Sequence, residues 1–442
     1  MQIGLVGTYD VDNFGDCLFP ELYAHLLGAA LPQARFTLYS PRPKAAQILS
    51  FDTVRALPDR LDTARDLTED ALILTGGETL GFGHSSGTYN FPRSVLSAYS
   101  RLWIAPLQAA LTSGGATKFI VHCVGARKMD DSLNQLAARA LQGAALCTLR
   151  DAFSQSWIRD DSLRFPVATD PMFLMDRIQT PAQWAARRKA VLPEGFEDGD
   201  GYLVAQLSLG YGGNALDDWC TAIAGIAGAR NLRVVLLPIC HFLEDEHYLG
   251  LAGDRLRALG VNTHLVTGRI NVKDTLSVIS GAYGYVGSSL HGAVAAVAFG
   301  IPLAALGHSP DGKHEGTLNS VGIHGCTGTK VTELPDCFSR SEMLDLAGAR
   351  KRAQAQAETD FAALLDALTR PAQQPEAVRN QALTAIRELV HREQTLHRGG
   401  SGYEIKRLVL RMLQRSGLYS AYGRARVRQR IARAAPRHAQ GS

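Results

Sequence analysis

Short continuous runs of apolar residues alternate with longer segments of helical period along the first part of this chain. Such runs are typical of buried strands, whereas apolar positions spaced by three and four residues are typical of amphipathic helices. We expect strands at residues 2–6, 35–39, 71–75, 118–124 and 145–149, and helices at 16–27, 94–111 and 132–141. Strands that alternate with helices predict a mostly parallel sheet with helices on both faces.

The same alternation starts again after a stretch of different character. Residues 179–200 hold a polar helical segment and a cluster of turn residues, which is typical of a linker. Beyond it we expect strands at 202–206, 232–238, 264–266 and 283–287, and helices at 217–227, 246–259 and 272–279. The pattern therefore predicts an α/β protein of two Rossmann-like domains, residues 1–178 and 201–340, with a central cleft between facing strand ends.

The remaining residues are predicted to be helical, and the last of them form a basic tail. Residues 341–398 have helical periodicity and are expected to pack back on the body of the protein. Residues 399–442 begin with a flexible Gly-Gly-Ser-Gly joint. Ten basic residues and no acidic ones lie between Lys406 and Arg437, so the rest of the chain carries 36 basic against 42 acidic residues.

This charge asymmetry bears on partners rather than on fold. An apolar stripe at Ile405, Leu408, Val409, Met412 and Leu413 lies between the basic residues. Such a helix can lie on an anionic membrane surface through residues 403–437. The alternative is a helix docked on the body and followed by a disordered basic end. Nucleic acid is not expected as a partner, because the tail has few aromatic residues. The sequence does not indicate the oligomeric state.

Composition excludes several other classes of protein. The chain has 442 residues, of which 46% are hydrophobic, and no run approaches the ~18 apolar residues of a membrane span. The N-terminus is predicted to be a strand and lacks the features of a signal peptide, so we expect a cytoplasmic location. The seven cysteines show no CxxC spacing, which predicts neither a disulfide framework nor a zinc site.

The turn at residues 287–292 carries the most informative candidate chemistry. It follows a buried strand and opens a helix, and open α/β sheets bind ligands at such strand ends. The helix dipole and the unpaired N–H groups of this turn favour a phosphate beside Ser288, Ser289, Leu290 and Gly292. His291 can move a proton next to that anion. The alternative is that one serine caps the helix and His291 is an ordinary surface histidine.

Two loops of the first half also follow buried strands. Asn13 and Asp16 either cap the first helix or face the cleft, where Asp16 can act as a base or bind a hydroxyl. Gly76 and Gly77 let backbone N–H groups approach a ligand closely, although a tight strand-to-helix turn needs glycine too. Glu78 follows them directly.

Three further polar residues complete the set of candidates. Arg150 can clamp a phosphate or a carboxylate, and the alternative is an ion pair with Asp151, which then caps a helix. Lys313, in a polar loop, can neutralise a phosphate. His241 is predicted to face the cleft as a polar group, because its separation from His247 is no recognised spacing of metal ligands.

Taken in order, these segments resemble the polysaccharide pyruvyl transferase family over residues 1–325. The matching motifs are Asn13-Phe14-Gly15-Asp16, Gly76-Gly77, Arg150-Asp151 with Ser154, Asp170-Pro171, and Ser288-x-Leu290-His291-Gly292 with Gly300-Ile301-Pro302. The resemblance implies a GT-B-like fold that transfers pyruvate from phosphoenolpyruvate to two hydroxyls of one sugar, with release of phosphate. It also implies catalysis by His291, a donor held by basic residues, and no cofactor or metal.

The implied acceptor is a glycan or lipid-linked oligosaccharide of exopolysaccharide or cell-wall synthesis, bound near Asn13, Glu78 and His241. The chain departs from the family where many members have arginine in place of Ser289 and a third glycine in place of Glu78. Either Arg150 or Lys313 then binds more of the donor, or the donor is a different molecule. Two alternatives stay open: a GT-B glycosyltransferase that uses a nucleotide sugar, and an inactive relative that binds glycans.

Overall fold

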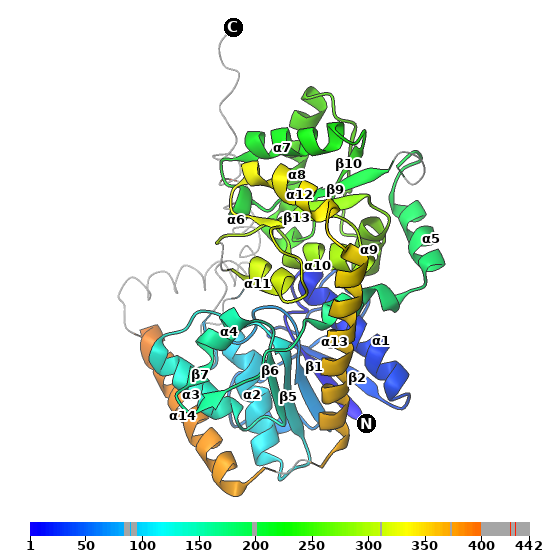
Figure 1. Ribbon diagram of the computed structural model, residues 1–442. Coiled ribbons are helices and arrows are strands. Elements are labelled where there is room, and N and C mark those ends of the chain that lie inside the picture. The colour runs from blue at the N-terminus through cyan, green and yellow to red at the C-terminus, as the bar shows by residue number, and fades with distance from the viewer. Residues whose placement is uncertain are drawn as a thin grey trace.

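The computed structural model describes residues 1–83, 89, 95–196, 201–309, 312–371 and 374–398, together with the single positions 425 and 429. Within these residues the chain forms two parallel six-stranded sheets, one after the other along the sequence (Figure 1). The first contains β1 (Gln2–Val6), β2 (Arg35–Ser40), β3 (Arg55–Ala56), β4 (Ala71–Leu74), β5 (Lys118–Val124) and β6 (Leu146–Leu149). The second contains β9 (Tyr202–Gln206), β10 (Arg233–Leu236), β11 (Thr263–Leu265), β12 (Gly284–Gly287), β13 (Leu303–Leu306) and β14 (Thr327–Gly328).

Both sheets have the same strand order. It is β3-β2-β1-β4-β5-β6 in the first sheet and β11-β10-β9-β12-β13-β14 in the second. The order therefore reverses between β1 and β4 and between β9 and β12, and ligands of open α/β sheets bind outside the carboxyl ends of strands at such a point. The structure confirms the predicted α/β fold of two Rossmann-like domains.

Helices pack on the faces of both sheets (Figure 1). The first domain contains α1 (Phe14–Ala30), η1 (Ala64–Asp66), α2 (Ala98–Thr112), α3 (Asp131–Leu141), α4 (Ala152–Trp157) and a hairpin of β7 (Arg159–Asp160) and β8 (Leu163–Arg164). The 3₁₀ helix η2 (Pro171–Ile178) and α5 (Pro181–Val191) lead into the second domain. That domain contains α6 (Leu209–Gly212), α7 (Leu216–Gly228), η3 (His241–Leu243), α8 (Asp245–Ala258), α9 (Val272–Ser280), α10 (Leu290–Phe299), α11 (Lys313–Asn319), η4 (Val331–Glu333) and α12 (Leu334–Glu342).

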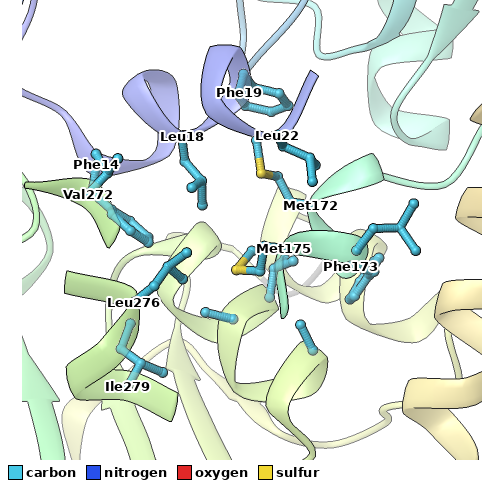
Figure 2. Packing of buried hydrophobic residues seen from close by; sticks show 14 of the residues in the cluster. Phe14, Leu18, Phe19, Leu22, Met172, Phe173, Met175, Val272, Leu276 and Ile279 are labelled. Atoms are coloured by element: carbon cyan, nitrogen blue, oxygen red, sulfur yellow. The ribbon is translucent and has the colours of Figure 1, made fainter. Parts of the chain in front are cut away.

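A shared apolar core joins the two domains. Side chains of α1, η2 and α9 point toward one another in it (Figure 2), and they are Phe14, Leu18, Phe19, Leu22, Met172, Phe173, Met175, Val272, Leu276 and Ile279. These side chains are buried between the two domains. Their burial stabilises one arrangement of the domains, because separating the domains would expose apolar surface to water. The core therefore fixes how the two sets of strand ends face each other.

Two long helices follow the second domain and pack back on the body. Helix α13 (Leu346–Thr369) contacts both β5 and α10, so it bridges the domains, and α14 (Glu376–Arg398) packs against α2 and α3 (Figure 1). Phe361 of α13 meets the rings of Tyr23 and His122 edge to face. Lys118 donates from Nζ to the carbonyl oxygens of Ala367 and Leu368, at the C-terminal end of α13, where a cation is favoured.

The predicted elements agree with the observed ones to within a few residues, with one late start. The expected helix at 94–111 begins at Ala98, where Ser97 accepts a hydrogen bond from the backbone N–H of Ser100. The basic tail at 399–442, for which membrane contact and docking on the body are the two alternatives, lies outside the described residues apart from positions 425 and 429. Among the described helices, none is both long and apolar enough to cross a membrane.

Candidate active site

The carboxyl ends of β1 and β4 face those of β9 and β12 across a cavity of about 260 Å³. Both points of strand-order reversal therefore open into one space. Most of the residues singled out in the sequence line this cavity: Asn13, Asp16, Gly77, Glu78, Arg150, Ser288, Ser289, Leu290, His291 and Lys313.

His291 is held between the two domains. It lies in the first turn of α10 and is only 8% exposed, so it is not the surface histidine of the alternative interpretation. Its Nε2 lies 3.7 Å from Oδ2 of Asp170, and neither atom has a hydrogen-bond partner among the described residues. Its Nδ1 lies against Gly15 of α1, and the ring of Phe19 meets the imidazole edge to face at 5.3 Å.

Asp170 supplies a buried negative charge behind this imidazole. Its Oδ1 accepts a hydrogen bond of 3.0 Å from the backbone N–H of Met172 and so caps η2. Burial raises the pKa of this carboxyl, but interactions with His291, with Arg150 and with the Met172 N–H outweigh it and leave the pKa below its ordinary value. An ionised carboxylate at this position orients the imidazole.

Asp16 lines the same cavity from the first turn of α1. Its Oδ2 accepts a hydrogen bond of 2.8 Å from Nδ2 of Asn13. Asn13 has the backbone geometry of an N-cap, yet its side chain makes no capping bond to the helix backbone. Its amide donates a hydrogen bond to Asp16 instead. Burial raises the pKa of Asp16, while His291 and Lys313 act in the opposite direction. A carboxylate with a raised pKa is a stronger base.

The turn before α10 is fixed by Gln206, at the end of β9. Its Oε1 accepts hydrogen bonds of 3.0 Å from the backbone N–H groups of both Ser288 and Ser289. Its Nε2 donates to Oδ2 of the buried Asp245, whose pKa burial raises to about 6. Ser289 caps α10 through the N–H of Gly292. The N–H groups of Ser288, Ser289 and Gly292 are therefore already bonded within the protein, and anion binding by the remaining N–H groups of this turn stays a prediction.

Two cations of the cavity are each paired with an acid. Arg150 is buried, and its Nε donates to Oδ2 of Asp151 at 3.2 Å, while Asp151 caps α4 through the N–H of Ser154. The ion pair with Asp151 is therefore present, and because Arg150 also lines the cavity, its binding of an anion stays a prediction. Nζ of Lys313 lies 3.5 Å from Oε2 of Glu78.

Three sequence candidates do not line the cavity. His241 is buried beside Asp12 and Arg269, because the short η3 turn directs its neighbours Cys240 and Phe242 into the cavity instead. The prediction that it faces the cleft is corrected. Gly76 and Gly292 are needed for packing: Gly76 has φ +89° beside Phe19, and a Cβ on Gly292 would lie 2.3 Å from the hydroxyl of Tyr285.

Sequence reasoning missed several residues that line the cavity. Arg127, Tyr99, Gln206 and Tyr211 all do so. Gln206 ends a predicted strand and Arg127 lies three residues beyond another, so a search of strand ends of the kind that singled out Arg150 would also have found them. Tyr99 and Tyr211 lie on helices and carry no such signal. Within the described residues, no cluster of three or more His, Cys, Asp or Glu side chains is arranged to hold a metal ion.

Two Rossmann-like domains that share a polar cavity at their facing strand ends define the class of two-domain group transferases with a GT-B-like fold. A solved structure of the same fold is UDP-GlcNAc 2-epimerase from Methanocaldococcus jannaschii, which is 10% identical, with a TM-score of 0.50 over 83% of this chain and 100% of that one. A glycosyltransferase from Rickettsia africae is 11% identical, with a TM-score of 0.47 over 88% of this chain and 98% of that one. A search of curated proteins gives no match.

The family is shown by the sequence itself. The model of the family described as "Polysaccharide pyruvyl transferase" matches residues 13–310, which is more than half of the chain. The chain belongs to this family and is a transferase. The match includes the ends of β4, β9 and β12 and every motif from Asn13 to His291.

Proposed function

We propose that the protein transfers the pyruvyl group of phosphoenolpyruvate to two hydroxyls of one sugar in a polysaccharide precursor, forming a cyclic ketal. The observation that carries this proposal is the arrangement of His291, Asp16, Arg150 and Lys313 around one cavity. It combines a histidine backed by a carboxylate, a carboxyl group of raised pKa, and two cations. Proton transfer and charge neutralisation are what this reaction needs, and no metal or cofactor is part of the proposal.

The donor would bind with its phosphate toward the two cations. Arg150 is held in place by Asp151, and its guanidinium retains N–H groups beyond the Nε that bonds Asp151. Lys313 begins α11 and lines the cavity, so its ammonium group can neutralise a phosphate bound there. Cations placed where negative charge develops stabilise the phosphate as it leaves.

The proton transfers can be assigned to the two groups that face each other. Asp16 removes the proton of the attacking acceptor hydroxyl as its oxygen bonds to the central carbon of the enol. His291 delivers a proton to the methylene carbon, which becomes the methyl group. The phosphate then leaves with the C–O bonding pair, and the second hydroxyl bonds to the same carbon. The two acceptor hydroxyls lose two protons in all. One of them balances the proton that the methylene carbon gains, and the other ends on phosphate or solvent.

The direct test is phosphate release from phosphoenolpyruvate in the presence of a glycan acceptor, with the ketal methyl group followed by NMR. The His291→Ala variant should lose the activity and keep its fold, because the imidazole is the proton donor. His25, an exposed histidine of α1, provides the control, and His25→Ala should retain wild-type turnover. Wild-type turnover by His291→Ala would contradict the proposal. Stabilisation by a uridine diphosphate sugar, without any effect of phosphoenolpyruvate, would favour a glycosyltransferase instead.

A further inference from the structure

A second arginine lines the cavity beside Arg150, on a framework of two hydrogen-bonded loops. The backbone N–H of Gly125 donates to the carbonyl of Gly77 at 2.8 Å, and the N–H of Arg127 donates to the carbonyl of Leu80, also at 2.8 Å. The segment after β5 therefore extends alongside the segment after β4. These backbone hydrogen bonds fix the position of the Arg127 backbone relative to the segment after β4.

Glycines in these two segments let both arginine side chains approach closely. A Cβ on Gly125 would lie 2.8 Å from Nη2 of Arg150, and a Cβ on Gly81 would lie 3.1 Å from the side chain of Arg127. Any larger residue at Gly125 would push the Arg150 guanidinium away. The segments after β4 and β5 thus leave space for the side chains of Arg127 and Arg150, which both line the cavity.

The two arginines differ in how their charge is compensated. Arg150 is paired with Asp151, and Lys313 with Glu78. Arg127 forms no ion pair within the described part of the chain, and its guanidinium carbon lies 4.2 Å above the centre of the Tyr99 ring. A cation on an aromatic face is oriented but keeps its charge. Among these three cations, Arg127 has the least compensated charge.

The catalytic turn itself carries no cation, since Ser288 and Ser289 precede Leu290 and His291. Arg150 interacts electrostatically with Asp170, and Lys313 with Asp16, so these two cations lie near the groups assigned to proton transfer. A donor with a phosphate and a carboxylate on the same carbon needs a further positive group for the second anion. Arginine suits this role because its planar fork bonds an anion through two N–H groups.

We propose that Arg127 is a donor-binding residue that holds the second anionic group of the donor, with Tyr99 orienting its guanidinium. This assignment rests on the proposed function. It predicts that donor affinity depends on Arg127 although the residue does not take part in proton transfer. The loss should therefore fall on KM for the donor more than on kcat.

The experiment compares Arg127→Gln with Lys128→Gln, which removes the same charge from the adjacent, exposed position of the loop. KM for phosphoenolpyruvate should rise about 10- to 100-fold in Arg127→Gln, the effect of one lost charge-assisted contact. The midpoint of thermal unfolding should be unchanged in Arg127→Gln. KM for phosphoenolpyruvate in Arg127→Lys should lie between the values of the wild type and of Arg127→Gln. A KM within about twofold of the wild type, or an equal rise in Lys128→Gln, would overturn the assignment.

Inhibition by inorganic phosphate and by pyruvate identifies which anion Arg127 holds. Weaker inhibition by one of them alone in Arg127→Gln supports the assignment and names the group, whereas unchanged inhibition by both overturns it. If the wild-type protein releases no phosphate from phosphoenolpyruvate with any acceptor, the proposed function fails. Calorimetric binding of phosphate and of pyruvate to the wild type and to Arg127→Gln then tests the arginine separately.

Discussion

The imidazole of His291 lies against the α-carbon of Gly15, so closely that a Cβ on Gly15 would come within 2.1 Å of Nδ1. The two residues belong to different domains, and each lies in the first turn of its helix, Gly15 in α1 and His291 in α10. Gly15 is thus required by the close approach of a side chain rather than by a positive φ. The glycine of the Asn-Phe-Gly-Asp motif makes room for the imidazole of His291.

Replacing Gly15 by alanine should therefore damage activity without removing any chemical group. The added methyl would displace the imidazole from Asp170 and Asp16, and a displacement of this size costs about 100-fold in kcat. Gly28 of the same helix offers a matched control, since its Cβ would meet nothing within 4 Å. Gly28→Ala should keep full activity and gain about 0.5–1 kcal/mol in the free energy of unfolding. Equal activity of the two variants would show that the imidazole tolerates the shift.

Asp170 offers a test of the carboxylate behind the imidazole. Asp170→Asn keeps the shape and the cap of η2 but removes the negative charge that lies 3.7 Å from Nε2 of His291. We expect kcat to fall by about 10²- to 10⁴-fold, with KM for the donor changed much less. Asp161→Asn, at an exposed position, is the matched control. A loss of folding without any change in the kcat of the folded fraction would assign Asp170 a structural role only.

Gln206 links the catalytic turn to a buried acid of the second domain. Gln206→Leu would leave the N–H groups of Ser288 and Ser289 without partners, and it would remove one hydrogen bond from Oδ2 of Asp245, which keeps the N–H of Cys240. Each unsatisfied buried group costs about 1–3 kcal/mol, so the unfolding free energy should fall clearly in denaturant titrations. The activity of the folded protein should fall as well, because His291 follows this turn. Unchanged stability would mean that water replaces the lost amide.

The overall fold could be predicted because buried strands and amphipathic helices have different periods, and both domains repeat the same alternation. Short edge strands such as β3 (Arg55–Ala56) and β14 (Thr327–Gly328) could not be predicted, because two residues are too few to show the alternation of apolar and polar positions that marks a strand. The 3₁₀ helix η2 was missed for a related reason. Its burial depends on α1 and α10, which pack against it from distant parts of the chain.

The candidate site was predictable where a polar residue lies in the segment after a strand: Arg150 follows β6 directly, and Asp16 and His291 lie in the first turns of the helices that follow β1 and β12. The partners of these residues were not predictable, because the pairing of Asp170 with His291 arises from how two domains pack. His241 shows the limit of the rule. It also follows a strand, yet a single turn of η3 decides which neighbouring side chains reach the cavity.

Two buried histidines should make the stability of the fold depend on pH. His122 bonds the hydroxyl of Tyr23 through Nδ1 and the carbonyl of Asp360 through Nε2, and Nε2 of His314 bonds the carbonyl of Ser288. Burial lowers the pKa of His122 to about 4 and that of His314 to about 3. Both rings are therefore neutral in the folded protein at pH values where they are protonated in the unfolded chain.

Between pH 6.5 and pH 4 the unfolded state consequently binds more protons than the folded state, so stability is fully present above about pH 6.5 and falls as the pH decreases. The expected slope is about 1.4 kcal/mol per pH unit for each histidine, which denaturant unfolding at pH 7, 6 and 5 can measure. His122→Gln should remove about half of this slope even if it also destabilises the protein at every pH. His25→Gln, on the exposed face of α1, should leave the slope as it is. An identical slope in wild type and His122→Gln would mean that His122 is protonated in the folded state as readily as in the unfolded chain.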